Sequence, residues 1–147
     1  MPDPLSSNAV PAAGFTSYIE QYSGTIYALS CLLLEKGARA DQAAVATFAA
    51  LYEPWLKGSI QSDFSLAAYR ECIRQCSLVA QDRGRCSSTL LTWEDQIASA
   101  LLYGIQLPLP EISLILQRSV PELKAQLRGI REQMAAARPA VPRPSAG

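Results

Sequence analysis

The sequence contains no histidine and carries no net charge, and both absences narrow the range of functions that the protein can have. Its 13 Lys and Arg residues balance 13 Asp and Glu residues in a chain of 147. Histidine is the usual general base and metal ligand near neutral pH, so its absence removes the common basis of acid–base and zinc chemistry. There is also no glycine-rich phosphate loop and no carboxylate pair at a spacing that a helix would bring together. We therefore expect a protein that is not an enzyme, with no catalytic residue, no cofactor and no metal.

Long hydrophobic runs are missing as well. No apolar stretch reaches the roughly 20 residues that a membrane-spanning helix needs. Residues 1–14 lack the charged and apolar regions of a secretory signal. We therefore expect a cytoplasmic protein without a membrane partner, in a compartment that keeps thiols reduced.

Cysteines are few and do not form a familiar metal-binding pattern. Cys31, Cys72, Cys76 and Cys86 are spaced C-x40-C-x3-C-x9-C, without the paired C-x2-C knuckles of zinc sites. Cys72 and Cys76 lie one helical turn apart and could join Cys31 or Cys86 in a disulfide or a four-thiolate site. We favour the interpretation that the cysteines are buried and pack as small hydrophobic side chains.

The charges are distributed unevenly although they sum to zero. Residues 1–104 hold 7 basic and 10 acidic residues, whereas residues 105–147 hold 6 basic and 3 acidic ones. A basic C-terminal part suits contact with DNA, and an acidic remainder suits contact with protein. The neutral total argues against strong DNA binding by this chain alone, because neutralisation of phosphates supplies most of that affinity.

Helical periodicity runs through the whole chain, and no strand alternation is visible. We expect an all-α protein with helices at about 15–36, 41–52, 65–82, 92–104, 109–117 and 120–137, with Gly37 as a stop and Asp41 as an N-cap. The predicted organisation is a disordered lead (1–14), a helical domain (15–83), a linker (84–91), a second helical domain (92–137) and a disordered tail (138–147).

The last two predicted helices form the most informative motif. Ser119 and Glu122 have the spacing of a capping box, and Thr92 and Asp95 form a second pair of this kind. Beyond the first box, an apolar stripe and an adjoining basic stripe follow a period of 3.6 residues. These stripes are Leu123, Leu127, Ile130 and Met134, and Lys124, Arg128 and Arg131. A short helix that turns into a longer basic one is typical of a helix-turn-helix, although an ordinary hairpin with a solvated basic face would share the pattern.

With these elements in order, the chain resembles a compact bacterial sigma factor of the extracytoplasmic-function (ECF) type. The stretch YIEQYSGTIYALSCLLLEKGARADQAAVATFAALY is similar to sigma region 2. The stretch DQIASALLYGIQLPLPEISLILQRSVPELKAQLRGIREQM is similar to region 4. The resemblance covers roughly residues 15–137. It implies two small helical domains, of which the second carries a helix-turn-helix.

The resemblance also implies partners and site residues. An ECF-type sigma factor binds RNA polymerase core and promoter DNA and is held by an anti-sigma factor. By position, polymerase or another partner would contact Asp41, Gln42, Val45 and Phe48. Promoter DNA would be contacted by Arg118, Ser119, Lys124, Gln126, Arg128 and Arg131. Residues 61–69 would lie near the promoter-melting segment. The positions at which the family carries a tryptophan and an asparagine for melting are occupied here by Tyr69 and Cys76.

The departures from the family pattern leave two alternatives to a DNA-binding sigma factor. The helix DQAAVATF keeps only Asp41 and Gln42 of the family's polar docking residues. This loss and the neutral charge favour a sigma mimic, which would bind an anti-sigma factor or another partner without binding DNA. The basic stripe of the last helix favours the DNA binder. The third interpretation is a helical adaptor unrelated to transcription.

Overall fold

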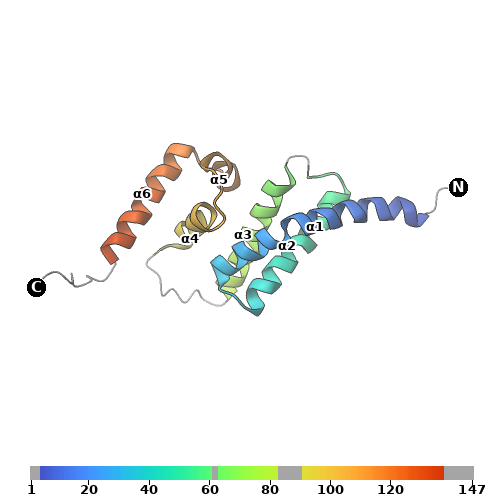
Figure 1. The fold of residues 1–147 in the computed structure, drawn as a ribbon, viewed down its shortest axis with the longest axis horizontal. Coiled ribbons are helices and arrows are strands. Elements are labelled where there is room, and N and C mark those ends of the chain that lie inside the picture. The colour runs from blue at the N-terminus through green and yellow to red at the C-terminus, as the bar shows by residue number, and fades with distance from the viewer. Residues whose placement is uncertain (1–3, 61–62, 83–90, 138–147) are drawn as a thin grey trace, which may run out of the picture.

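The structure is a computed structural model that describes residues 4–60, 63–82 and 91–137, and every regular element in these ranges is a helix (Figure 1). The elements are α1 (Pro4–Leu34), α2 (Ala38–Leu56), α3 (Phe64–Asp82), α4 (Trp93–Ser99), the π-helical turn η1 (Ala100–Gly104), α5 (Leu109–Leu116) and α6 (Val120–Ala137). The predicted all-α class is confirmed. Within the described ranges, none of these helices has the length and apolar content needed to cross a membrane.

Helix α1 is built on an apolar repeat of alternating four and three residues. Its members are Phe15, Ile19, Tyr22, Ile26, Leu29 and Leu33, and all of them are buried or partly buried. Such a repeat keeps one stripe of the helix facing the core between Phe15 and Leu33. The helix ends at Leu34, where Glu35 adopts a left-handed conformation with φ of 67°.

The N-terminal boundary of α1 differs from the prediction. Residues 1–14 were expected to be disordered, but α1 begins at Pro4, and a proline is tolerated at the first helical positions. The helix is supported by α2, because a Cβ atom at Gly14 would lie 3.1 Å from the Trp55 ring. Residues 83–90, with most of the predicted linker and Cys86, and the predicted tail 138–147 lie outside the described residues.

Helix α2 is longer than predicted at both ends. Gly37 is its N-cap residue, and Asp41 lies in the first turn, where a carboxylate interacts favourably with the positive end of the helix dipole. The predicted role of Asp41 as N-cap is therefore wrong. The helix also continues through Pro54 to Leu56. A proline this close to the C-terminus removes a single helical hydrogen bond, so the last turn survives.

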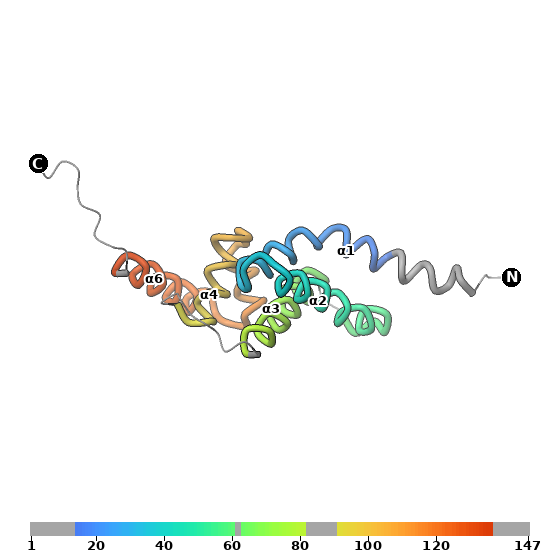
Figure 2. The backbone as a smooth tube through the Cα atoms, turned by 90° about the horizontal axis from the view of Figure 1, so that it is seen from below, coloured from blue at the N-terminus to red at the C-terminus, as the bar shows by residue number. Residues whose placement is uncertain are grey.

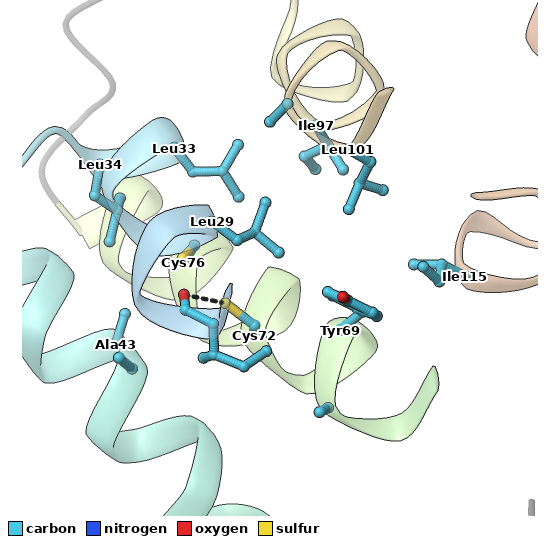
Figure 3. Packing of buried hydrophobic residues seen from close by; sticks show 14 of the residues in the cluster. Leu29, Leu33, Leu34, Ala43, Tyr69, Cys72, Cys76, Ile97, Leu101 and Ile115 are labelled. Carbon is cyan, nitrogen blue, oxygen red and sulfur yellow. Dashed lines mark hydrogen bonds between the residues drawn. The ribbon is translucent and has the colours of Figure 1, made fainter. Parts of the chain in front are cut away.

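The two halves of the chain share one hydrophobic core. Figure 2 shows α4 and α6 side by side at one end and α1, α2 and α3 packed together at the other. One contiguous cluster of buried side chains spans both groups, and a small second cluster of Ala98, Leu127 and Ile130 lies under α6. Figure 3 shows Leu29 and Leu33 of α1 on the side of the core that faces Ile97 and Leu101. The α1–α3 bundle and the α4–α6 half are therefore joined by packing.

The C-terminal half follows the predicted local signals closely. Helix α5 ends at Leu116, and Gln117 closes it in a left-handed conformation with φ of 56°. The backbone N–H of Arg118 then donates to the carbonyl of Ser113 over 3.1 Å. This cap turns the chain sharply, and α6 begins at Val120. The predicted short helix at 109–117 is confirmed to within one residue.

Candidate interaction surfaces

Three basic side chains form an exposed line on α6, which we name the cationic row: Lys124, Arg128 and Arg131. They recur at positions 0, +4 and +7, which places them on one side of the helix. The adjoining leucine seam, Leu123, Leu127 and Ile130, is 0%, 4% and 1% exposed. The predicted orientation, with the seam inward and the cations outward, is confirmed. Met134 departs from the predicted stripe, because it is 55% exposed near the C-terminal end of α6.

The N-terminus of α6 is closed by the predicted capping box. The Glu122 backbone N–H donates to Ser119 Oγ over 3.2 Å, and the Ser119 backbone N–H donates to Glu122 Oε1 over 3.0 Å. The Ser119 hydroxyl also donates to Glu122 Oε1 over 2.9 Å. These bonds from Ser119 lower the pKa of Glu122, because they favour its charged form. Ser119 is exposed, as expected of a DNA-contacting residue, but its hydroxyl is already used in the cap.

Arg118 and Gln126, which were also predicted to face DNA, make their hydrogen bonds inside the C-terminal half. Arg118 Nη1 donates to Gln126 Oε1 over 2.8 Å, and Gln126 Nε2 donates to Asp95 Oδ1 over 2.8 Å. Both predicted residues are partly buried. They connect α6 to α4 and lie apart from the cationic row. The sequence placed Asp95 only in a cap with Thr92, and that bond is present too, from Asp95 N–H to Thr92 Oγ1 over 3.1 Å.

Helix α2 presents a second exposed line, which we name the apolar row: Val45, Ala49, Tyr52 and Leu56. Val45 is 69% exposed and Leu56 is 46% exposed, so large apolar side chains face solvent here. The predicted contact residues Asp41 and Gln42 are exposed at the N-terminal end of this row. Its later members were not predicted as contact residues, although their spacing of +4, +7 and +11 from Val45 is the signal that identifies them.

Phe48, the fourth predicted partner-binding residue, is not part of this surface. It is 9% exposed and belongs to the core with Ala44 and Leu51. Residues 44, 48 and 51 recur at +4 and +7 and therefore share the buried side of α2. The prediction was wrong because α2 is apolar on two sides, and the sequence alone does not say which side the rest of the chain covers.

Comparison with known proteins identifies a solved structure with a similar fold. No protein-family model matches the chain, and no curated protein matches it. Among solved structures, the chain is similar to CnrH in the structure of CnrH in complex with the cytosolic domain of CnrY. The TM-score is 0.69 at 14% sequence identity, and the match covers 87% of this chain and 92% of that one. The chain has the fold of an ECF-type sigma factor.

On this sigma-type fold, Tyr69 and Cys76, which stand where the family carries a tryptophan and an asparagine, are inside the protein. Tyr69 is 8% exposed and Cys76 is 0% exposed. Burial raises the pKa of Tyr69, and the nearby Glu111 carboxylate adds to the shift.

The three cysteines within the described residues are buried or partly buried, as the sequence predicts. Cys72 and Cys76 are buried and Cys31 is partly buried, and all three are free thiols. The Cys72 Sγ atom lies 3.4 Å from Ser30 Oγ and donates to the Ile26 carbonyl over 3.7 Å. The hydrogen bond to Cys72 and burial raise the pKa of Cys76. Among the described residues, no group of three or more Cys, Asp or Glu side chains is placed to hold a metal ion.

Proposed function

We propose that this chain is a sigma-like transcription regulator that contacts promoter DNA through α6 and RNA polymerase core through α2. The observation that carries the proposal is the cationic row, exposed on a capped helix whose leucine seam is buried. The ECF-type sigma fold supports it, as does the resemblance of both halves of the sequence to sigma regions 2 and 4.

The cationic row suits a contact with phosphates. Three cations on one helical face release a few counterions when they approach a duplex, which gives moderate, salt-sensitive affinity. Ser119 and Gln126 are the polar residues that could read base edges, but their side chains are bonded within the chain. We therefore propose that α6 fixes the position of the regulator on the phosphate backbone and that polymerase provides the remaining affinity.

The apolar row suits a contact with protein. Monomeric surfaces rarely expose several large apolar side chains on one helix unless a partner covers them. Asp41 and Gln42 extend the row with a carboxylate and an amide at the exposed start of α2. We propose that polymerase core docks on this row.

Fluorescence anisotropy with labelled promoter duplex at several salt concentrations tests the DNA contact. The wild type is expected to bind with an affinity that falls as salt rises, and the double variant Lys124→Ala/Arg128→Ala is expected to lose at least tenfold in affinity. The matched control is Lys57→Ala/Arg74→Ala. It removes two cations that form exposed ion pairs with Glu53 and Glu71, away from α6. Equal affinity of the two double variants contradicts the proposal.

The arrangement of the two halves favours a second candidate function, a sigma mimic. The superposition with CnrH in complex with the cytosolic domain of CnrY extends over 87% of this chain, and both halves here share one core. A chain already folded in this arrangement would lose little conformational freedom on capturing an anti-sigma factor. The mimic is expected to bind such a partner and to show no salt-sensitive binding of duplex. Titration calorimetry against an anti-sigma cytosolic domain from the same organism distinguishes it from the DNA binder.

A further inference from the structure

We propose that the chain rests in a closed state in which Arg70 of α3 latches its two halves together. Arg70 is exposed at the edge of the bundle, and its guanidinium reaches across to α5. Its Nη2 donates to the Leu114 carbonyl over 2.7 Å, and its Nε donates to the Ile115 carbonyl over 3.4 Å. Both acceptors belong to the last turn of α5.

These acceptors make Arg70 a helix cap supplied by the other half of the chain. The last four carbonyls of a helix have no partner within it and carry the negative end of the helix dipole. Bonds from a charged guanidinium are stronger than bonds between neutral groups. An arginine that satisfies two such carbonyls at once therefore stabilises closure specifically, and any separation of the halves breaks both bonds.

Apolar side chains pack between the two halves next to the Arg70 contact. Figure 3 shows Tyr69, the residue before Arg70, between α3 and the side chains of Leu101 and Ile115. Helix α1 also passes so close to η1 that a Cβ atom at Gly104 would overlap the Leu32 side chain. The latch thus closes over a packed apolar interface.

Packing of the two halves against each other covers part of the surface of α3. Tyr69 is 8% exposed in the closed state, and parting of α3 and α5 would uncover it. A contact between the uncovered face of α3 and promoter DNA would rest on the proposed function. The latch itself does not depend on that function.

Small-angle X-ray scattering on the full chain tests the latch with a matched pair of charge reversals. Arg70→Glu places a carboxylate against the α5 carbonyls and is expected to increase the radius of gyration. Arg74→Glu makes the same charge change one turn later on the same helix, where the side chain is 61% exposed and pairs with Glu71. It is expected to leave the radius of gyration unchanged. Arg70→Lys keeps one cationic donor and is expected to stay closed. Circular dichroism checks that all three variants keep wild-type helicity.

Hydrogen exchange at the backbone amides of α5 provides a second, local readout of opening. Arg70→Glu is expected to raise exchange there at least tenfold over Arg74→Glu. Either a larger radius of gyration or the faster exchange, specific to Arg70→Glu, supports the latch. Agreement of the two variants in both measurements overturns it, as does a wild-type scattering profile that fits an open chain. Neither measurement uses DNA or polymerase, so failure of the latch and failure of the proposed function are distinguishable.

Discussion

Gln126 on α6 donates a 2.8 Å hydrogen bond to the Asp95 carboxylate on α4, and this bond joins the helix that carries the cationic row to the rest of the C-terminal half. The first prediction is that Gln126→Leu lowers the free energy of unfolding by about 1–3 kcal/mol, because it leaves the partly buried Asp95 carboxylate and Arg118 guanidinium without this partner. Urea unfolding measures the change. Gln133→Leu, at an exposed position two turns later, is the control and is expected to change stability by less than about 0.5 kcal/mol.

The second prediction concerns the N-cap of α6. Ser119→Ala removes the oxygen that accepts from the Glu122 backbone N–H, so it is expected to destabilise the protein by about 0.5–2 kcal/mol. Ser119→Asp keeps an acceptor and should retain most of the wild-type stability. Thermal unfolding of both variants measures the change, and wild-type stability of Ser119→Ala would show that the cap contributes nothing.

The third prediction is a pH dependence that follows from Glu122. Bonds from Ser119 hold its folded-state pKa below the ordinary value of 4.5, so the unfolded chain takes up a proton at higher pH than the folded one. The stabilisation is therefore fully present above pH 4.5 and is lost as the pH falls through the lower folded-state value. Glu122→Gln should reduce the loss of stability between pH 7 and pH 3, measured as the urea midpoint. Glu132→Gln, exposed near the other end of α6, should keep the wild-type pH profile.

The features that the sequence predicted correctly are local ones. The capping box at Ser119, the leucine seam and the stop after α5 each depend on residues within one or two helical turns, where spacing alone determines contact. The sequence also predicted that Lys124, Arg128 and Arg131 would face outward, because they lie beside the seam.

The features that the sequence missed depend on which elements meet. Phe48 and Val45 both belong to apolar stripes of α2, and only packing against α1 and α3 decides that Phe48 is inside and Val45 is outside. Gln126 was assigned to DNA because its partner Asp95 lies 31 residues away in sequence. The contact of Arg70 with α5 crosses 44 residues, and no local pattern encodes it.

The fourth prediction addresses the thiols. Cys72 and Cys76 are 0% exposed, whereas Cys31 is partly exposed, so a bulky disulfide reagent should modify Cys31 well before the other two. Peptide mapping by mass spectrometry after timed exposure of the native protein gives the order. In urea these three thiols of the described residues should react alike, which serves as the control. Early modification of Cys72 in native buffer would show that α1 and α3 separate readily.

The last prediction separates the stability of α6 from the chemistry of its surface. Leu123 is 0% exposed in the leucine seam, so Leu123→Ala should lower the free energy of unfolding by about 2–5 kcal/mol through lost burial and a residual cavity. Arg128, one turn further along and exposed, should tolerate alanine within about 0.5 kcal/mol. Urea unfolding of both variants measures the contrast. If Arg128→Ala destabilised the protein as much as Leu123→Ala, the cationic row would be part of the structural framework, and a loss of DNA affinity in row variants could no longer be attributed to lost phosphate contacts.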